Sequence, residues 1–580
     1  MSLSPVDSVR SVQRFRLSLA LLAVFAGPLS FAESPGDDSE SRPEKPEYSV
    51  HRGHYEEPFE LEIRAPGSRL SIIYTTDGSE PSPEPLNGVH VSAAPDDAQP
   101  AQARVVVDDT MSVRAIAASI GSVSKIATHS YVFPRKVLQQ SEPARSTPRW
   151  GHSGPDWEID PQVVEHRDSA SRLVAKDLLA IPALYISLSP EDIWGDGGIY
   201  LDGEGDPRDC YVELLNPAAH PDDPNRVRGP HKHATVEITG GSSTERWKTD
   251  KLSFRLRFHH GTKFPFLSNP GTDPDGGEVD HFHTLILDAR LNESWTHPSA
   301  SQRKFAQYTR DQFLADLQRA AGGLAPRGRH VHLYIAGVYW GLYNLHERPD
   351  HHFAAAYRGG KAHEWEVVKH NAADIVNGDG SNFRKLQDRI SQPDIASARA
   401  YEEISALLDV EDFARYILVN FWAGNTDWSH QNWYASYRPG DPSGRWRFHS
   451  WDGEHVLKEL DEDVTGKNDP GGPTAFHRRL MQNPEYQALF ISAIREAMAP
   501  GGALYPQRLA SSYRAHASEV DAAVRAESAR WGDNRHRRPY VRGDDWEKER
   551  DRLLDAYLPR RTAIFLEQLG LSELLSAGNP

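Results

Sequence analysis

Three oxygen-bearing side chains, Asp427, Asn432 and Asp452, stand where a polar loop and the hairpin after it could bring them together. Asn432 is the fifth residue after Asp427. Residues 433–437 and 445–451 have the composition of two strands joined by a Pro-Gly-Asp-Pro-Ser-Gly turn, and Asp452 follows the second strand directly. Carboxylate and amide oxygens are the hard ligands that Mg²⁺ prefers. The spacing therefore predicts a divalent-metal site at one rim of the hairpin.

A helix should precede this loop. Behind Asp409, which can cap a helix, apolar residues recur at helical intervals: Phe413, Tyr416, Ile417 and Phe421. Gly424 is suited to end that helix. Protein-kinase chemistry uses this order of parts: a loop Asp that orients the attacking hydroxyl, an Asn for a metal ion, and a second Asp after a hairpin. Asp and Asn are common in loops, so the pair alone is a weak signal. Its position between helix and hairpin favours phosphoryl transfer from ATP.

A cation for the phosphates is harder to choose. Lys251 begins the alternating run 251–258, which is typical of a strand, and could reach a phosphate. Lys248 lies close by, Lys369 is an equally placed rival, and an exposed lysine at a strand end fits the pattern as well. The nearest glycine-rich candidate for a phosphate loop is Gly240-Gly241-Ser242-Ser243, whose glycines could also form only a turn.

Two further segments bear on a kinase-like site. The helical pattern of residues 301–321 contains Arg310-Asp311 but no obvious glutamate in its middle, so a kinase-type Lys–Glu pair is not predicted. Residues 330–347 form a predicted hairpin that ends in Glu347. Most single carboxylates at strand ends are merely solvated, so this position alone assigns Glu347 no function.

Several runs together resemble the CotH family of spore-coat-type secreted kinases. They are residues 251–258, Arg310-Asp311, residues 338–347, 424–428 and 432–434, Trp446-Arg447-Phe448 and residues 451–454. The resemblance implies a divergent protein-kinase fold that uses ATP and Mg²⁺ (or Mn²⁺) to phosphorylate Ser/Thr hydroxyls of proteins.

Carried over by position, the resemblance assigns roles to individual residues. It implies that Asp427 is the hydroxyl-orienting base, that Asn432 and Asp452 are metal ligands, and that Lys251 is the phosphate ligand. Glu347 closes the family's GxYxLxE run and is implied to lie near the nucleotide. Asp452 is followed by Gly-Glu instead of Phe-Gly, so conventional activation-loop switching is not expected.

The N-terminal segment has the three parts of a secretory signal. Arg10, Arg14 and Arg16 precede an apolar run, and Ser30-Phe31-Ala32 offers a cleavage site. Residues 1–32 are thus a predicted signal peptide, with an uncleaved anchor as the alternative, and the Pro-rich residues 33–47 are a predicted linker. We expect a secreted, periplasmic or cell-surface protein without a transmembrane segment after cleavage.

Residues 48–134 alternate apolar and polar residues in short runs between Gly, Pro and Asp turns, a pattern typical of a β-sandwich. Residues 74–81 and 113–117, with Tyr131, resemble the chitobiase/β-hexosaminidase C-terminal-like module. The resemblance implies an immunoglobulin-like accessory domain. A spacer role is favoured over contact with a glycan or the cell envelope, because fold does not fix function.

Length and composition limit the remaining choices. A chain of 580 residues is expected to form several domains, and its net charge of −17 argues against a nucleic-acid partner. The lone Cys210 excludes an internal disulfide framework. The predicted fold is a β-sandwich (immunoglobulin-like) module followed by an α+β atypical protein-kinase-like domain. After the module, we predict a linker at residues 135–180, the kinase-like domain at 181–483 and the helical C-terminal part of that domain at 484–580.

Two other functions stay open at this point. The chain could be a non-catalytic cell-surface or envelope protein that keeps a kinase-like scaffold and binds glycan or protein through residues 48–134. A glycosidase is the weaker alternative, because no pair of acid and nucleophile carboxylates can be assigned from the sequence.

Overall fold

The computed structural model describes residues 42–92, 99–142, 156–202, 206–216, 231–245, 247–263 and 279–576. The predicted signal peptide lies outside these residues, as does most of the first linker. None of the helices within the described ranges is long and apolar enough to cross a membrane. The chain divides into two units, Met1–Arg42 and Pro43–Pro580, and everything below concerns the second.

The first part of this unit is β-rich. One sheet has the order β1-β3-β8 and the other the order β2-β11-β9-β4-β7, with β10 paired to β9 and a small β5-β6 ribbon apart. Strand β8 alternates exposed and buried residues, so that Ala103, Val105 and Val107 enter a core shared with Leu61 of β3 and Val113 of β9. Both sheets therefore enclose one apolar core. The strands are β1 (Glu47–Tyr48), β2 (Gly53–His54), β3 (Phe59–Arg64), β4 (Ser71–Thr75), β5 (Ser82–Pro83), β6 (Leu86–Asn87), β7 (Val89–Val91), β8 (Gln102–Val107), β9 (Met111–Ser119), β10 (Ser122–Val123) and β11 (Ala127–Val132).

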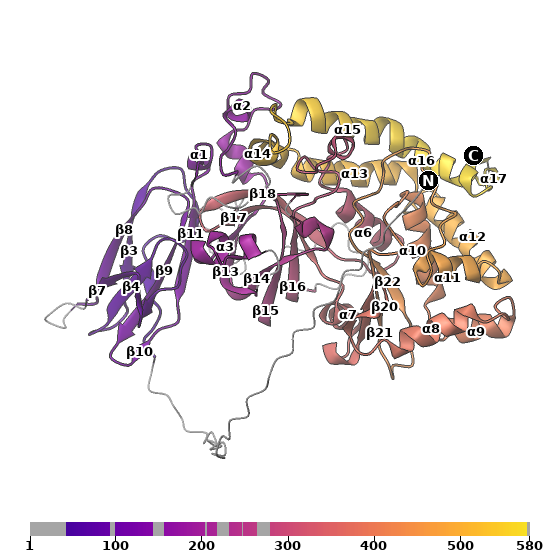
Figure 1. The fold of residues 1–580 in the computed structure, drawn as a ribbon, viewed down its shortest axis with the longest axis horizontal. Coiled ribbons are helices and arrows are strands. Elements are labelled where there is room, and N and C mark those ends of the chain that lie inside the picture. The colour runs from indigo at the N-terminus through magenta and orange to yellow at the C-terminus, as the bar shows by residue number, and fades with distance from the viewer. Residues whose placement is uncertain are drawn as a thin grey trace, which may run out of the picture. The chain divides into compact units, whose positions relative to one another are not determined.

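A closed seven-stranded barrel follows, in the order β12-β13-β14-β15-β16-β18-β17 (Figure 1). Neighbouring strands are antiparallel except β12 and β17, whose parallel pairing closes the barrel. On β17, Val331, Leu333 and Ile335 enter one core cluster while Tyr334 enters another, as alternation requires. The strands are β12 (Ala183–Ser187), β13 (Arg208–Leu215), β14 (His231–Thr239), β15 (Ser253–Lys263), β16 (His281–Asp288), β17 (Gly328–Ile335) and β18 (Val338–Glu347).

The second half combines a four-stranded sheet with helices. The sheet has the order β20-β19-β21-β22, from strands β19 (Glu366–Lys369), β20 (Asn371–Asn377), β21 (Trp433–Tyr437) and β22 (Arg447–Ser450). Helix α10 (Val410–Trp422) contacts β22 and buries most of its length. Asp409 caps it by accepting from the Asp412 N–H at 3.1 Å, and Gly424 follows it with a φ of 63°. The predicted helix, its cap and the hairpin after it are confirmed.

Helices contact both the sheet and the barrel. Those before and beside α10 are α1 (Pro134–Val137), α2 (Pro161–Val164), α3 (Pro190–Trp194), α4 (Ile199–Asp202), α5 (Ala300–Arg303), α6 (Arg310–Ala320), α7 (His351–Arg358), α8 (Ser381–Ser391) and α9 (Ala398–Ser405). The C-terminal ones are α11 (Pro473–Leu480), α12 (Pro484–Met498), α13 (Pro506–Val520), α14 (Ala523–Trp531), α15 (Glu547–Asp551), α16 (Leu558–Gln568) and α17 (Glu573–Ser576). Helices α6 and α10 contact β22, α8 contacts β20, α4 contacts β14 and α7 contacts β16. The helical C-terminal region is confirmed, and its helix α14 contacts β18 of the barrel (Figure 1).

Candidate functional site

A polar cleft of about 510 Å³ lies among the ends of barrel strands, the β14–β15 loop and the segments that flank the β21–β22 hairpin. The predicted residues Asp427, Asn432, Asp452 and Lys369 all line it. Its other charged or histidine lining residues are Glu237, Arg255, Asp288, His346, Arg348, His370 and Glu454. The structure thus brings together four of the six side chains singled out from the sequence.

Asp427 and Asn432 are held in one loop by direct contacts. Asn432 Nδ2 donates to the backbone oxygen of Asp427 at 3.0 Å and to its Oδ2 at 3.1 Å. Gln431 Nε2 donates to both carboxylate oxygens, at 3.0 and 3.1 Å. Asn432 has a φ of 61°, in the left-handed region, and its N–H donates to His370 Nδ1 at 2.9 Å. The Asp427 carboxylate is therefore fixed in orientation, yet its side chain stays one-third exposed at the cleft.

Asp452 is half-buried and lies among other carboxylates. Burial and then the negative charges of Asp288 and Asp311 raise its pKa to about 7, against the opposing effect of Arg290. Its backbone has a φ of 55°, a conformation that costs free energy at a non-glycine residue. Burial, followed by the charges of Asp452 and Asp288, likewise raises the pKa of Glu454 well above its ordinary value. Mutual repulsion of this kind is what a bound cation would relieve.

One guanidinium lies inside this acidic group. Arg290 Nη1 is 2.7 Å from Asp288 Oδ2 and 2.9 Å from Asp311 Oδ2, and Arg290 Nη2 donates to Asn344 Oδ1 at 2.8 Å. Asp311, in the first turn of α6, also accepts from the Gly453 N–H at 2.5 Å. The Arg290–Asp311 ion pair therefore connects the end of β16 to α6, and Asp311 connects α6 to Gly453, the residue that follows Asp452.

The sequence pattern pointed to Asp311 only as part of the Arg310-Asp311 run, and it did not single out Arg290 or Asp288. A kinase-type pair is expected to use a glutamate in the middle of the helix, whereas the acid here is an aspartate in the first turn. The strand ends at Asp288 and Arg290 has a φ of 58°, so strand alternation in the sequence could not reveal this pairing.

Three cations line the same cleft. Arg255 Nε pairs with Glu237 Oε1 at 2.6 Å, and Arg348 Nε donates to the Tyr434 hydroxyl at 3.1 Å. Lys369 Nζ, at the end of β19, lies 3.6 Å from Asp374 Oδ2. These contacts leave N–H groups of each cation available for an anionic ligand.

The Gly240–Ser243 run borders the cleft between β14 and β15. Gly240 has a φ of 142°, and a Cβ there would lie 2.3 Å from Ser243 Oγ, so the turn requires glycine. The run thus lines the same cleft as the three cations.

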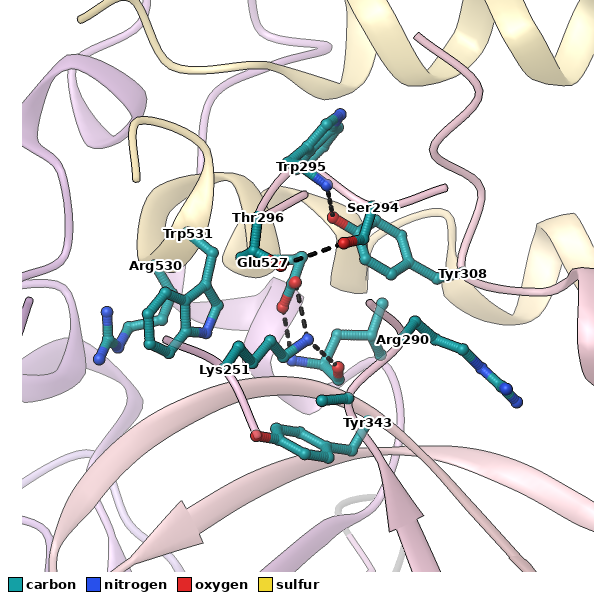
Figure 2. Close-up of polar contacts among 12 residues, drawn as sticks. Lys251, Arg290, Ser294, Trp295, Thr296, Tyr308, Tyr343, Glu527, Arg530 and Trp531 are labelled. Carbon is teal, nitrogen blue, oxygen red and sulfur yellow. Dashed lines mark hydrogen bonds and ion pairs between the residues drawn. The ribbon is translucent and has the colours of Figure 1, made fainter. Parts of the chain in front are cut away.

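Lys251 is not among the residues that line the cleft, in contrast to the role implied for it. Figure 2 shows it among Tyr308, Tyr343 and Glu527. Its Nζ donates to the backbone oxygen of Leu342 at 2.6 Å and pairs with Glu527 Oε1 of α14 at 2.7 Å. The side chains of both ions are fully buried, and the ammonium lies over the rings of Tyr308 and Tyr343. A residue just before a strand can face either side, and the partner is 276 residues away, so the pattern could not reveal this pairing. The position corrects the expectation that Lys251 reaches a phosphate, and its rival Lys369 is the lysine in the cleft.

Glu347 also faces away from the cleft. Side chains alternate along a strand, so its neighbours His346 and Arg348 line the cleft while Glu347 points to the other side of β18. It accepts from the Arg327 N–H at 2.9 Å and from the Tyr357 hydroxyl of α7 at 3.0 Å. These contacts make Glu347 an anchor for α7, which corrects the expectation of direct nucleotide contact.

Comparison with known proteins gives one finding. A family model described as CotH kinase protein matches residues 236–564, which is more than half of the chain. The match includes the cleft residues from the end of β14 onward and excludes residues 48–134, whose likeness to a chitobiase-type module stays a prediction. No curated protein matches the chain.

Proposed function

Because the chain belongs to the CotH kinase family, we propose that it transfers the γ-phosphoryl group of ATP to Ser/Thr hydroxyls of envelope or extracellular proteins. The observation that carries this proposal is the presence of Asp427, Asn432 and Asp452 on one cleft that also contains a glycine turn and three cations. Kinase catalysis is largely positioning and electrostatic stabilisation, and this cleft offers groups for both.

The residues fit a divalent cation. Asp452 and Asn432 would hold it, since carboxylate and amide oxygens suit Mg²⁺ and Mn²⁺. The crowding that raises the pKa of Asp452 supports this assignment, because carboxylates gathered without compensation are costly. When bound, the ion would neutralise charge on the triphosphate.

The cations and the glycine turn would bind the phosphates. Arg348 and Lys369 stand at the ends of β18 and β19, and Arg255 lies on β15 next to the turn. Their guanidinium and ammonium groups can each donate hydrogen bonds to phosphate oxygens. Backbone N–H groups of the turn at Gly240 and Gly241 would add further donors.

Asp427 would orient the attacking hydroxyl and accept its proton. Gln431 and Asn432 hold its carboxylate, so the acceptor oxygen keeps one direction as the substrate arrives. The Arg290–Asp311 pair would keep α6 and Gly453 in register with Asp452. These two residues are positioning residues, since they act through Asp452.

Export is part of the proposal and is supported by the basic and apolar N-terminal segment. The acceptor in this proposal is a protein hydroxyl; the family's description adds only that its members are kinases.

The test uses the full chain with labelled ATP, Mg²⁺ or Mn²⁺, and general acceptor proteins, with self-labelling recorded as well. Asp452→Asn should abolish labelling and the rise in melting temperature with metal and ATP. Asp544→Asn, at an exposed carboxylate far along the chain, is the matched control and should behave as wild type. Equal labelling by wild type and Asp452→Asn would refute the proposal. Binding to polysaccharide without any response to nucleotide would favour a non-catalytic surface protein.

A further inference from the structure

A second set of metal-binding groups lies beside Asp452. Ligand atoms of Asp288, Asp311 and His346 lie within 4.8 Å of one another, and no other trio of this kind is found among the described residues. The three residues come from β16, α6 and β18, so the fold and not a local turn brings them together. None of them was singled out from the sequence as a metal ligand.

The ring of His346 has one nitrogen that is free to bind a metal ion. His346 Nδ1 lies 2.8 Å from the backbone oxygen of Glu347, which can only accept, so the hydrogen of the neutral ring is on Nδ1. Nε2 then presents a lone pair. It is buried, has no hydrogen-bond partner among the residues of the described ranges, and lies 3.8 Å from Asp288 Oδ2. The side chain is only 5% exposed, and its ring packs edge-on against Trp451.

A buried lone pair without a donor costs free energy. It costs more beside a carboxylate, because nitrogen and oxygen then present electrons to each other. A metal ion satisfies both groups at once, and an N–H donated to a backbone carbonyl is how metal-binding histidines are commonly oriented.

The charge balance leaves room for a cation. Asp288, Asp311, Asp452 and Glu454 are accompanied by Arg290 within this group. The Arg290 guanidinium contacts one oxygen of Asp288 and one of Asp311. The other oxygen of Asp288 accepts from the Arg290 N–H at 2.8 Å, and the other oxygen of Asp311 accepts from the Gly453 N–H. Each carboxylate oxygen has a second lone pair for another ligand. The guanidinium and an ion can therefore share the two carboxylates.

We propose that Asp288, Asp311 and His346 form a second divalent-cation site, which binds Mn²⁺ or another first-row transition metal in preference to Mg²⁺. Imidazole suits transition metals, whereas Mg²⁺ is best served by oxygen ligands alone. The site needs no nucleotide, so it differs from the ion that Asn432 and Asp452 would hold.

The test is metal binding by the full, chelator-treated chain without nucleotide. Titration calorimetry should give roughly tenfold or greater preference for Mn²⁺ over Mg²⁺, a factor in the range that single metal-site groups contribute. Pulsed electron paramagnetic resonance of the Mn²⁺ form should show coupling to an imidazole nitrogen. His346→Gln should remove that coupling and reduce the Mn²⁺ preference.

His283→Gln is the matched control. His283 is a partly exposed histidine of β16 that stacks on His352 outside the cleft, at a ring distance of 4.0 Å. It should leave both the coupling and the preference unchanged. Circular dichroism and the melting temperature of each variant show that it folds.

Three outcomes would overturn the site. They are no Mn²⁺ binding without nucleotide, a nitrogen coupling that persists in His346→Gln, and loss of binding in His283→Gln instead. Arg290→Met adds a check: if only this variant binds Mn²⁺, the two carboxylates serve the guanidinium alone. None of these measurements uses labelling from ATP. The metal-binding result can therefore be interpreted even if the kinase proposal fails.

Discussion

Replacing Lys251 by methionine separates a structural lysine from a phosphate-binding one. The Nζ of Lys251 is 2.7 Å from Glu527 Oε1, with both side chains fully buried, and Glu527 Oε2 also accepts from the Leu342 N–H at 2.8 Å. Methionine keeps the apolar stem but leaves the Glu527 carboxylate buried without its counter-charge. Removing one partner of a buried pair costs about 3–5 kcal/mol. We therefore expect a clearly lower free energy of unfolding.

Two measurements on the same samples decide the question. Chemical denaturation gives the change in stability, and the KM for ATP, measured well below the melting temperature, gives the effect on the nucleotide. Lys251→Met should unfold at a lower denaturant concentration than wild type, with a nearly unchanged KM for ATP. Lys369→Met should raise the KM for ATP with little loss of stability. Lys248→Met is the control, because its pairing with Glu245 at 3.9 Å is partly exposed and contributes under about 1 kcal/mol.

A second variant tests the cause of the instability. In Lys251→Met/Glu527→Gln the uncompensated charge is gone, while the amide oxygen can still accept from Leu342. The double variant should therefore be more stable than Lys251→Met alone. A Lys251→Met protein with wild-type stability and a strongly raised KM for ATP would refute the structural role. It would show instead that Lys251 binds the phosphates.

Three further predictions concern the cleft and β18. Asn432→Ala should lower kcat by about 100-fold or more, because it removes two contacts to Asp427 as well as a metal ligand, and steady-state kinetics would check this. Burial raises the pKa of Glu347 to about 7, so the stability present below its ordinary pKa of 4.5 should fall by about 3 kcal/mol as pH rises to 7. Glu347→Gln should flatten that part of the curve of unfolding free energy against pH, and an unchanged slope would contradict the assignment. Asp452 has a pKa of about 7 without metal, so metal binding should weaken and release more protons as pH falls through 7, which calorimetry in buffers of different ionisation enthalpy can measure.

Local patterns predicted the part of the site that is built from consecutive elements. The apolar spacing of α10, its cap at Asp409 and the hairpin after the polar loop are all encoded within about one helix and two strands. The pairing of Trp433 with Ser450 brings the two ends of that hairpin together, which is why Asn432 and Asp452 meet at its rim. Kinase chemistry supplied the rest of that expectation.

Contacts between distant segments could not be predicted in the same way. The direction of Lys251 depends on a glutamate of α14, and the face of Glu347 depends on which side of β18 meets the cleft. Likewise, Arg290 and Asp311 meet only because the barrel places the end of β16 against the first turn of α6. Periodicity describes which residues share a face, but it does not say what covers that face.

The most direct test of the central claim is a crystal structure of the full chain with Mn²⁺ and a non-hydrolysable ATP analogue, with the metal located by anomalous scattering. We predict a metal peak in contact with oxygens of Asp452 and Asn432, phosphates beside Arg348 and Lys369, and Asp427 facing the γ-phosphate. A nucleotide bound elsewhere, or a cleft with neither nucleotide nor metal at saturating concentrations of both, would contradict this prediction.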